Sequence, residues 1–465
     1  MLAPPSARPA GSATWHAYPV EMAALARIAL PLVLAMVGQM AIMTTDMLML
    51  GWLGPEALAA TALALSAFHP VMLFGIGIGT AVTPLAAAAL AKRQVREMRR
   101  AVRQGFWAAL PFTALAVPAL WWIGQLFEAI GQDPELSRNA QLYMRGVLPG
   151  LFFMLIFNVL RAYATTLQHT RPVLIVTLLA IPLNALINYG LIFGAFGLPR
   201  LEVFGAGLGS AITNAVMALA MLWIVRHRLP FRRHHVLGRF WRPDWPIFRA
   251  IHRIGIPIGL FILLEVGIFA GSAQILGYIG VYQLAGHQIV LQLASITFMV
   301  PLGVGQAVTA RVALARGRAD PAGARIAGQA SMLLATAFMS CTALVFWFLP
   351  GPLIRPFLDG SPQSLDVLAF ATGYLAIAAV FQIVDGLQVT AAHALRGLQD
   401  TRVPLLIAAF GFWVLAFPTA VVLGLFTPLE GKGVWLAFAL GLATAALLLI
   451  RRFLRLTRPA PSRAD

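Results

Sequence analysis

Three carboxylic acids lie inside long apolar stretches of the sequence, where charged side chains are rare. They are Asp46, Glu265 and Asp385, and no Lys or Arg lies well inside those stretches to neutralise them. An ionised carboxylate at the centre of a bilayer costs about 2.5 to 3.5 kcal/mol. We therefore expect each acid to face a cavity and to bind a proton or another cation. A neutral acid hydrogen-bonded between helices, or an interfacial position for Asp46, is the alternative.

Amide side chains accompany these acids. On a helix, Gln382 and Gln388 lie about one turn before and one turn after Asp385, so the three form a polar stripe on one face. In the N-terminal half, amides could join Asp46 in one polar network; they are Asn158, Asn184 and Asn188. Ordinary hydrogen bonds between helices would also explain these amides.

Histidine and cysteine give weaker signals. His69, His287 and His393 lie within or beside apolar stretches without metal-ligand spacing, so we interpret them as hydrogen-bonded residues of the core or its edge. Cys341 is the only cysteine, which excludes a disulfide framework and a thiolate metal site. We expect no structural metal and no cofactor.

The composition indicates an all-α integral membrane protein. Of 465 residues only 11% are charged and 60% are hydrophobic, whereas soluble domains carry about 25% charged residues. The first apolar run is too long for a secretory signal peptide, so we expect it to be a spanning helix. Twelve apolar runs of membrane-spanning length predict twelve transmembrane helices, at residues 28–50, 58–90, 106–127, 142–160, 173–193, 206–225, 254–276, 284–308, 330–349, 367–391, 405–425 and 434–450.

The basic residues predict the orientation of the chain. With twelve spans, 29 of the 34 Lys and Arg fall on the side that holds both termini, which is therefore expected to be cytoplasmic. Residues 226–253 contain eight arginines, and we interpret this segment as a linker that touches anionic lipid rather than nucleic acid. Residues 92–103 are expected to form a short amphipathic helix at the same surface.

The chain reads as two copies of one unit. Residues 27–31 and 50–54 recur 226 positions later, and so does the Gly-x-Gly-x-Ala-Val-Thr motif of residues 77–83. Six spans in each copy give a parallel repeat. We therefore predict an N-terminal lobe (1–225), a basic linker (226–253) and a C-terminal lobe (254–465). Pro31 and Pro257 occupy equivalent positions and are candidate hinges, although packing kinks would explain them equally well.

The motifs resemble those of the multidrug and toxic compound extrusion transporters, in particular the NorM-like bacterial branch. The resemblance covers about residues 22–450. It is carried by Asp46 with the Leu-Gly-x-Leu-Gly motif of residues 50–54, by Glu265, and by Asp385 with the Leu-Arg-Gly-Leu-Gln-Asp-Thr-Arg motif of residues 395–402.

This resemblance implies a V-shaped pair of six-helix bundles in the bacterial inner membrane. It also implies a proton- or sodium-coupled antiporter that exports organic cations, drugs and other amphiphiles by alternating access. The implied partners are these small molecules and membrane lipid, without nucleic acid, and we expect a monomer. The implied ion and substrate residues are Glu265, Asp385, Gln382, Gln388 and Phe381 in one lobe, and Asp46, Gln39, Asn158, Asn184 and Asn188 in the other.

The residues around the two C-terminal acids bear on the identity of the coupling ion. Glu265 and Asp385 are the positions at which sodium would bind transiently. Sodium-associated members of the family carry a tyrosine one turn before the acid of the tenth helix, whereas this chain has Phe381. A proton needs only one carboxylate and a path to water, so we expect a proton rather than sodium.

Two other functions stay open at this point. A flippase of lipid-linked oligosaccharides would line its cavity with several basic residues, but the intramembrane charges predicted here are all acidic. An integral-membrane enzyme that uses Glu265 and Asp385 as a catalytic pair is the second alternative. A major facilitator is disfavoured because residues 91–104 lack its Gly-x-x-x-Asp-Arg signature.

Overall fold

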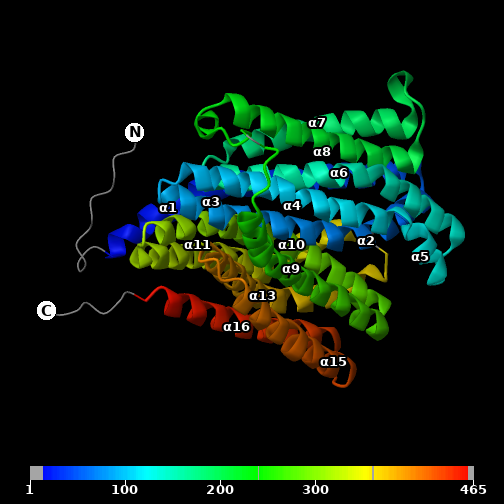
Figure 1. Cartoon of the computed structure of the whole chain (residues 1–465). Coiled ribbons are helices and arrows are strands. Elements are labelled where there is room, and N and C mark those ends of the chain that lie inside the picture. Colours follow the sequence, from blue (N-terminus) through cyan, green and yellow to red (C-terminus); the bar gives the residue numbers. More distant parts are fainter. Residues whose placement is uncertain (1–13, 239, 359–360, 459–465) are drawn as a thin grey trace.

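A computed structural model of the chain describes residues 14–238, 240–358 and 361–458, which are almost entirely helical (Figure 1). The elements of the first half are α1 (Thr14–Leu53), α2 (Pro55–Thr80), α3 (Val82–Ala91), α4 (Val95–Trp121), α5 (Ile123–Ala129), α6 (Pro134–Thr166), α7 (Arg171–Phe193), η1 (Ala195–Gly197), α8 (Glu202–His227) and η2 (Phe231–His234). Those of the second half are α9 (Trp245–Ile279), α10 (Val281–Gly317), α11 (Pro321–Phe348), α12 (Pro350–Ile354), η3 (Arg355–Phe357), α13 (Ser364–Gly397), α14 (Arg402–Ala408), η4 (Ala409–Ala416), α15 (Phe417–Leu425) and α16 (Glu430–Leu456).

Within the described residues, eleven helical stretches are long and apolar enough to cross a bilayer, and α4 with α5 forms a twelfth that is bent by 45°. The predicted twelve-helix, all-α membrane fold is thereby confirmed. The amphipathic helix expected at residues 92–103 is not a separate element, because α4 begins at Val95 and continues into the third span. The first turns of α4 carry arginines, so the apolar run alone predicts a helix start about ten residues later than the observed one.

The backbone itself repeats. Six non-glycine residues with positive φ form three equivalent pairs, Arg93 with Ala319, Gln168 with Gln399, and Glu202 with Glu430. The first two pairs follow the ends of α3, α10, α6 and α13, where left-handed residues commonly terminate helices. The closing hydrogen bonds agree as well, since the amide three residues beyond α3 bonds to Ala89 O at 2.9 Å and its counterpart beyond α10 bonds to Ala315 O at 3.0 Å. The duplication inferred from sequence is therefore present in the fold.

The two halves meet through equivalent helices, since α2 packs against α9 and α1 packs against α10. A Cβ built on Gly77 of α2 would lie only 2.4 Å from Gly259 Cα of α9, so the two backbones touch there. In the equivalent contact, a Cβ on Gly303 of α10 would lie 2.4 Å from a methyl carbon of Val33 in α1. The repeated glycine motif thus serves close helix packing between the two halves.

The first helix of each half changes partners along its length. Near its start α1 contributes Leu25 and Ile28 to the hydrophobic core of the C-terminal half, whereas Ala35 belongs to the N-terminal core. Correspondingly, α9 contributes Ile254 to the N-terminal core and Phe261 to the C-terminal core. Pro31 and Pro257 lie inside these helices, next to the points where the partner changes.

All these contacts lie toward one end of the molecule, which we call the basic end. It holds the start of α1 and the end of α16 (Figure 1) and the arginine-rich connection between α8 and α9. Arg311 of α10 forms a bidentate ion pair with Glu21 of α1 there, and Gln399 Nε2 donates to Pro84 O at 3.4 Å. The two lobes therefore form a V whose apex is at the basic end.

The connection between the lobes is shorter than the basic segment of the sequence, because α8 extends to His227 and α9 begins at Trp245. It is held against α6. Phe231 is buried, and the hydroxyl of Tyr163 lies 3.0 Å from His234 Nδ1. Partial burial lowers the pKa of His234, and the charges of Arg233 and Arg99 lower it further.

Candidate substrate and ion sites

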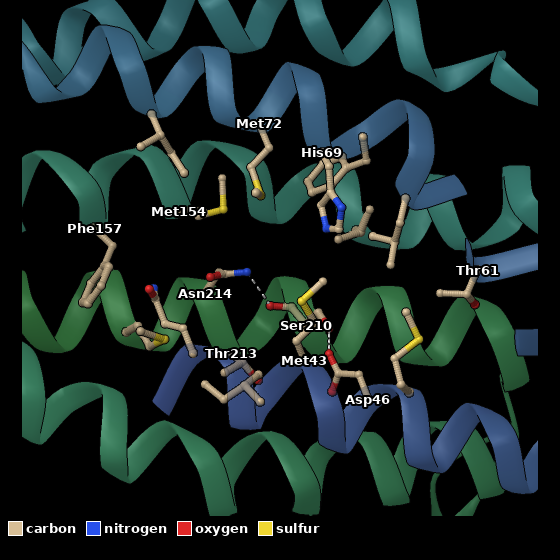
Figure 2. Close-up of a pocket in the computed structure, with 18 of the residues that line it drawn as sticks. Met43, Asp46, Thr61, His69, Met72, Met154, Phe157, Ser210, Thr213 and Asn214 are labelled. Carbon is tan, nitrogen blue, oxygen red and sulfur yellow. Dashed lines mark hydrogen bonds between the residues drawn. The ribbon is translucent and has the colours of Figure 1, made fainter. Parts of the chain in front are cut away.

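A cavity of about 250 Å³ lies within the N-terminal lobe, between α1, α2, α6 and α8. Among the described residues that line it, Asp46 is the single acidic residue, and most of the others are apolar or aromatic (Figure 2). Five methionines face the cavity: Met43, Met47, Met72, Met154 and Met217. Methionine is flexible and polarizable, so such a lining adapts to ligands of different shape.

Hydrogen bonds hold the carboxylate of Asp46 on the cavity wall. Asn188 Nδ2 donates to Asp46 Oδ1 at 2.5 Å, and Ser210 Oγ donates to Asp46 Oδ2 at 2.8 Å. Asn214 Nδ2 donates in turn to Ser210 O at 3.0 Å, as the dashed lines of Figure 2 show. Both oxygens of Asp46 are thus fixed by neutral donors, which leaves its negative charge uncompensated by an ion pair within the described residues.

The other residues expected with Asp46 divide into two groups. Asn184 stays close to the acid and donates to Thr213 Oγ1 at 3.4 Å, and Gln39 lines the same cavity. Asn158 also lines the cavity but does not hydrogen-bond Asp46. Its Oδ1 accepts from Arg161 at 2.7 Å and its Nδ2 donates to Ile76 O at 3.1 Å, so the expected network of Asp46 with all three asparagines is corrected at this position.

Sequence reasoning missed several lining residues. His69 was interpreted as a core residue, yet it lines the cavity and points into it (Figure 2). Ser210, Thr213 and Asn214 were not singled out, although they lie on one face of α8 beside Asp46. Their spacing of three to four residues was the signal that could have found them.

In the C-terminal lobe, Glu265 of α9 and Asp385 of α13 are close enough to interact electrostatically. Gln382 lies beside them and accepts a hydrogen bond from Thr297 Oγ1 at 3.0 Å. Gln388 is fully buried, and neither of its amide atoms has a hydrogen-bond partner within the described part of the chain. The pairing of the two acids in one ion site stays a prediction.

Phe381 is buried in an aromatic cluster one turn before Asp385. Its ring makes edge contacts with Trp435 at 5.5 Å and with Phe269 at 6.2 Å between centroids. His287 packs against Trp435 in the same cluster and lies 3.3 Å from Ser272 Oγ. This wall of the acid site is apolar.

The two lobes place their acids at different positions of the repeat. At the offset of 226, Glu265 corresponds to Gln39 and Asp46 corresponds to Ser272, since 265 − 226 = 39 and 46 + 226 = 272. At each of these two positions, one lobe has an acid and the other lobe has a neutral polar side chain. The duplicated halves are not chemically equivalent.

The expectation that all intramembrane charges are acidic is wrong. The helices continue beyond the apolar runs, and these extensions carry Arg161 in α6 and Arg396 in α13. Arg396 is only 7% exposed, interacts electrostatically with Glu265, and lies over the ring of Phe261 at 5.2 Å. The apolar runs predict helix ends before these two arginines, so the sequence pattern did not place them within the helices.

The comparisons with known proteins agree with this architecture. The MatE family model matches residues 31–190 and again residues 257–422, with starting points 226 residues apart. A probable multidrug resistance protein NorM of Mesorhizobium japonicum is 39% identical over 444 residues, covering 95% of each chain. The protein of the same name from Rhodopseudomonas palustris is 41% identical over 461 residues, covering 98% of this chain and 96% of its own.

Solved structures show the same fold at lower identity. An outward-facing conformation of a multidrug resistance MATE family transporter of the MOP superfamily superposes with a TM-score of 0.85 at 18% identity, covering 97% of this chain and 99% of that one. The eukaryotic MATE transporter AtDTX14 gives 0.81 at 18% identity, covering 95% and 99%. The chain is therefore a multi-pass membrane protein that belongs to the MatE family and to its NorM-like branch.

Proposed function

We propose that this protein is a cation-coupled antiporter that exports organic cations, drugs and other amphiphilic xenobiotics by alternating access. The observation that carries the proposal is the pair of acid sites, one in each lobe of a V that is closed at the basic end. The names of its relatives, multidrug resistance proteins, support the substrate class.

The substrate site in this proposal is the N-terminal cavity. Asp46 supplies the negative charge that attracts a cation, and methionine and aromatic side chains supply a deformable apolar wall. Such a cavity selects by charge and hydrophobicity rather than by shape. Gln39, His69 and the α8 residues Ser210 and Asn214 offer hydrogen bonds around the acid.

The coupling ion in this proposal binds at Glu265 and Asp385. The two carboxylates interact, so a bound cation relieves their mutual repulsion. We favour a proton over sodium because a hard cation prefers several oxygen ligands. Gln382 Oε1 already accepts from Thr297, and Phe381 adds only an aromatic wall.

Pro31 and Pro257 are the proposed hinges. Each lies where its helix leaves the core of one half for the core of the other, and proline weakens the local helix by removing one backbone hydrogen bond. Bending there would let the lobes separate at the basic end without unpacking either core. The moving bodies are the two lobes defined from the sequence, residues 1–225 and 254–465, joined by 226–253.

The proposed location is the bacterial inner membrane with the basic end in the cytoplasm, following the distribution of Lys and Arg. The V then opens to the outside in this conformation. We propose that the protein acts as a monomer, since each chain contains both sites. A flippase is less well supported, because Arg161 and His69 share the N-terminal cavity with the acid Asp46 rather than forming a basic wall.

Reciprocal binding tests this function. If substrate and coupling cation oppose each other, each must weaken the binding of the other by the same factor. Glu265→Gln and Asp385→Asn should each reduce the pH dependence of organic cation binding in purified protein, leaving the part that comes from Asp46 itself. Asp366→Asn is the matched control, because this exposed acid lies at the start of the same helix as Asp385. Wild-type pH dependence in either site variant would remove that acid from the mechanism.

A further inference from the structure

A second, much smaller cavity of about 30 Å³ lies between the two lobes, on the basic-end side of the N-terminal cavity. Polar side chains from both halves line it. The N-terminal half contributes Thr83, Asn158 and Arg161, and the C-terminal half contributes Thr309, His393 and Arg396. It is therefore a polar chamber at the floor of the V, built by both lobes together.

Neutral side chains orient both arginines in this chamber. Arg161 Nη2 donates to Asn158 Oδ1 at 2.7 Å, and the other end of that amide is held by Ile76 O. Arg396 Nη1 donates to His393 Nε2 at 2.9 Å, because a guanidinium has no lone pair to accept with. The remaining ring nitrogen of His393 then carries the proton, and it lies 3.2 Å from Thr309 Oγ1.

The chamber is short of negative charge. Among the described residues, neither Arg161 nor Arg396 forms an ion pair with a carboxylate. Glu265 interacts electrostatically with Arg396 and offsets at most one of the two positive charges. A buried charge without a counter-ion is costly, so an anion placed between two fixed guanidinium groups would be strongly favoured.

We propose that this chamber binds one small inorganic anion of the size of chloride. The volume admits one or two particles as large as a water molecule, which excludes a phospholipid headgroup or an amphiphilic drug. The ligands come from both lobes, so the bound anion holds the floor of the V together and favours this conformation over one opened at the basic end. The site does not depend on the transport activity proposed above.

The test is the ³⁵Cl nuclear magnetic resonance linewidth of chloride in the presence of the purified full-length protein. Specific binding broadens the line, and bromide should reverse the broadening, whereas the larger gluconate at equal ionic strength should not. Arg161→Gln and Arg396→Gln should each weaken the bromide-sensitive binding about tenfold or more, because each removes a charged hydrogen-bond donor. Arg451→Gln is the control, since Arg451 is exposed near the end of α16.

A second variant guards against misfolding. Gln306 lines the chamber, and its side-chain Nε2 donates to Met36 Sδ at 3.7 Å. Gln306→Glu keeps the size of the side chain and supplies an internal counter-ion, so it should abolish chloride binding while the protein elutes normally on size exclusion. The proposal is overturned if the wild type shows no bromide-sensitive broadening, or if well-folded Arg161→Gln and Gln306→Glu variants both bind chloride like the wild type.

Discussion

Replacing Asp46 by asparagine changes the charge of the N-terminal cavity with little change in its structure. The new side chain keeps an oxygen that accepts from Asn188, and its amide group can donate to Ser210 Oγ, which now accepts instead of donating. Both hydrogen bonds are therefore retained in altered form. The expected loss of stability is below about 1 kcal/mol, the net value of one ordinary hydrogen bond.

The effect on a cationic ligand should be much larger. An interaction with a charged group contributes about 1.5 to 3 kcal/mol, and each 1.4 kcal/mol corresponds to about a factor of ten in affinity. Asp46→Asn should thus weaken binding of an organic cation by roughly 10- to 150-fold. A neutral ligand of similar size should lose little, because the methionine and aromatic walls are unchanged.

Isothermal titration with tetraphenylphosphonium measures this difference, with a neutral aromatic compound of like size for comparison. Glu56→Gln is the matched control, because Glu56 is an exposed acid at the start of α2. Equal affinity of the wild type and Asp46→Asn for the cation would refute the assignment of this cavity as the cation site. An equal loss for the cation and the neutral compound would indicate a structural effect instead.

Three further perturbations test the architecture. Gly77→Ala should lower the melting temperature of the protein, because the added Cβ would clash with Gly259. Gly51 has open space around it, so Gly51→Ala should leave the melting temperature unchanged or raise it. A thermal-shift assay compares the two variants. Arg311→Gln breaks the ion pair between α10 and α1 and should shift the population toward a form open at the basic end by about fivefold or more, seen as longer spin-label distances across that end. Burial lowers the pKa of His234, so its docking is fully stable above about pH 6.5 and weakens as the pH falls from there through the lowered pKa. Protection of the η2 amides against hydrogen exchange, measured relative to their intrinsic rates at each pH, should therefore fall on acidification in the wild type and not in His234→Gln.

Much of the fold could be predicted from the sequence because the bilayer imposes a simple rule. Every span must be long, apolar and helical, so the number of helices and their duplication follow from apolar runs and repeated motifs. Helix ends could not be predicted in the same way. Arginines at the basic end are tolerated within helices because they reach polar partners, as Arg311 reaches Glu21. For this reason α4, α6 and α13 continue beyond their apolar runs.

The candidate site was predictable only in part for a related reason. Isolated acids in apolar helices are conspicuous, and Asp46 does lie in the wall of a cavity. Partners on other helices depend on rotation and packing, which a single sequence does not specify. Asn158 illustrates this, since its amide turns toward Arg161 on its own helix and not toward Asp46 on α1.

The most direct test of cation-coupled export is uphill transport by the purified protein in liposomes. With a proton gradient imposed and sodium absent, the wild type should accumulate a fluorescent organic cation on the side of the membrane from which the protons flow. The Glu265→Gln and Asp385→Asn variants should not. The experiment is repeated with an inward sodium gradient, equal pH on both sides and a protonophore. Accumulation under those conditions alone would make sodium the coupling ion, and no accumulation under either gradient would contradict the account.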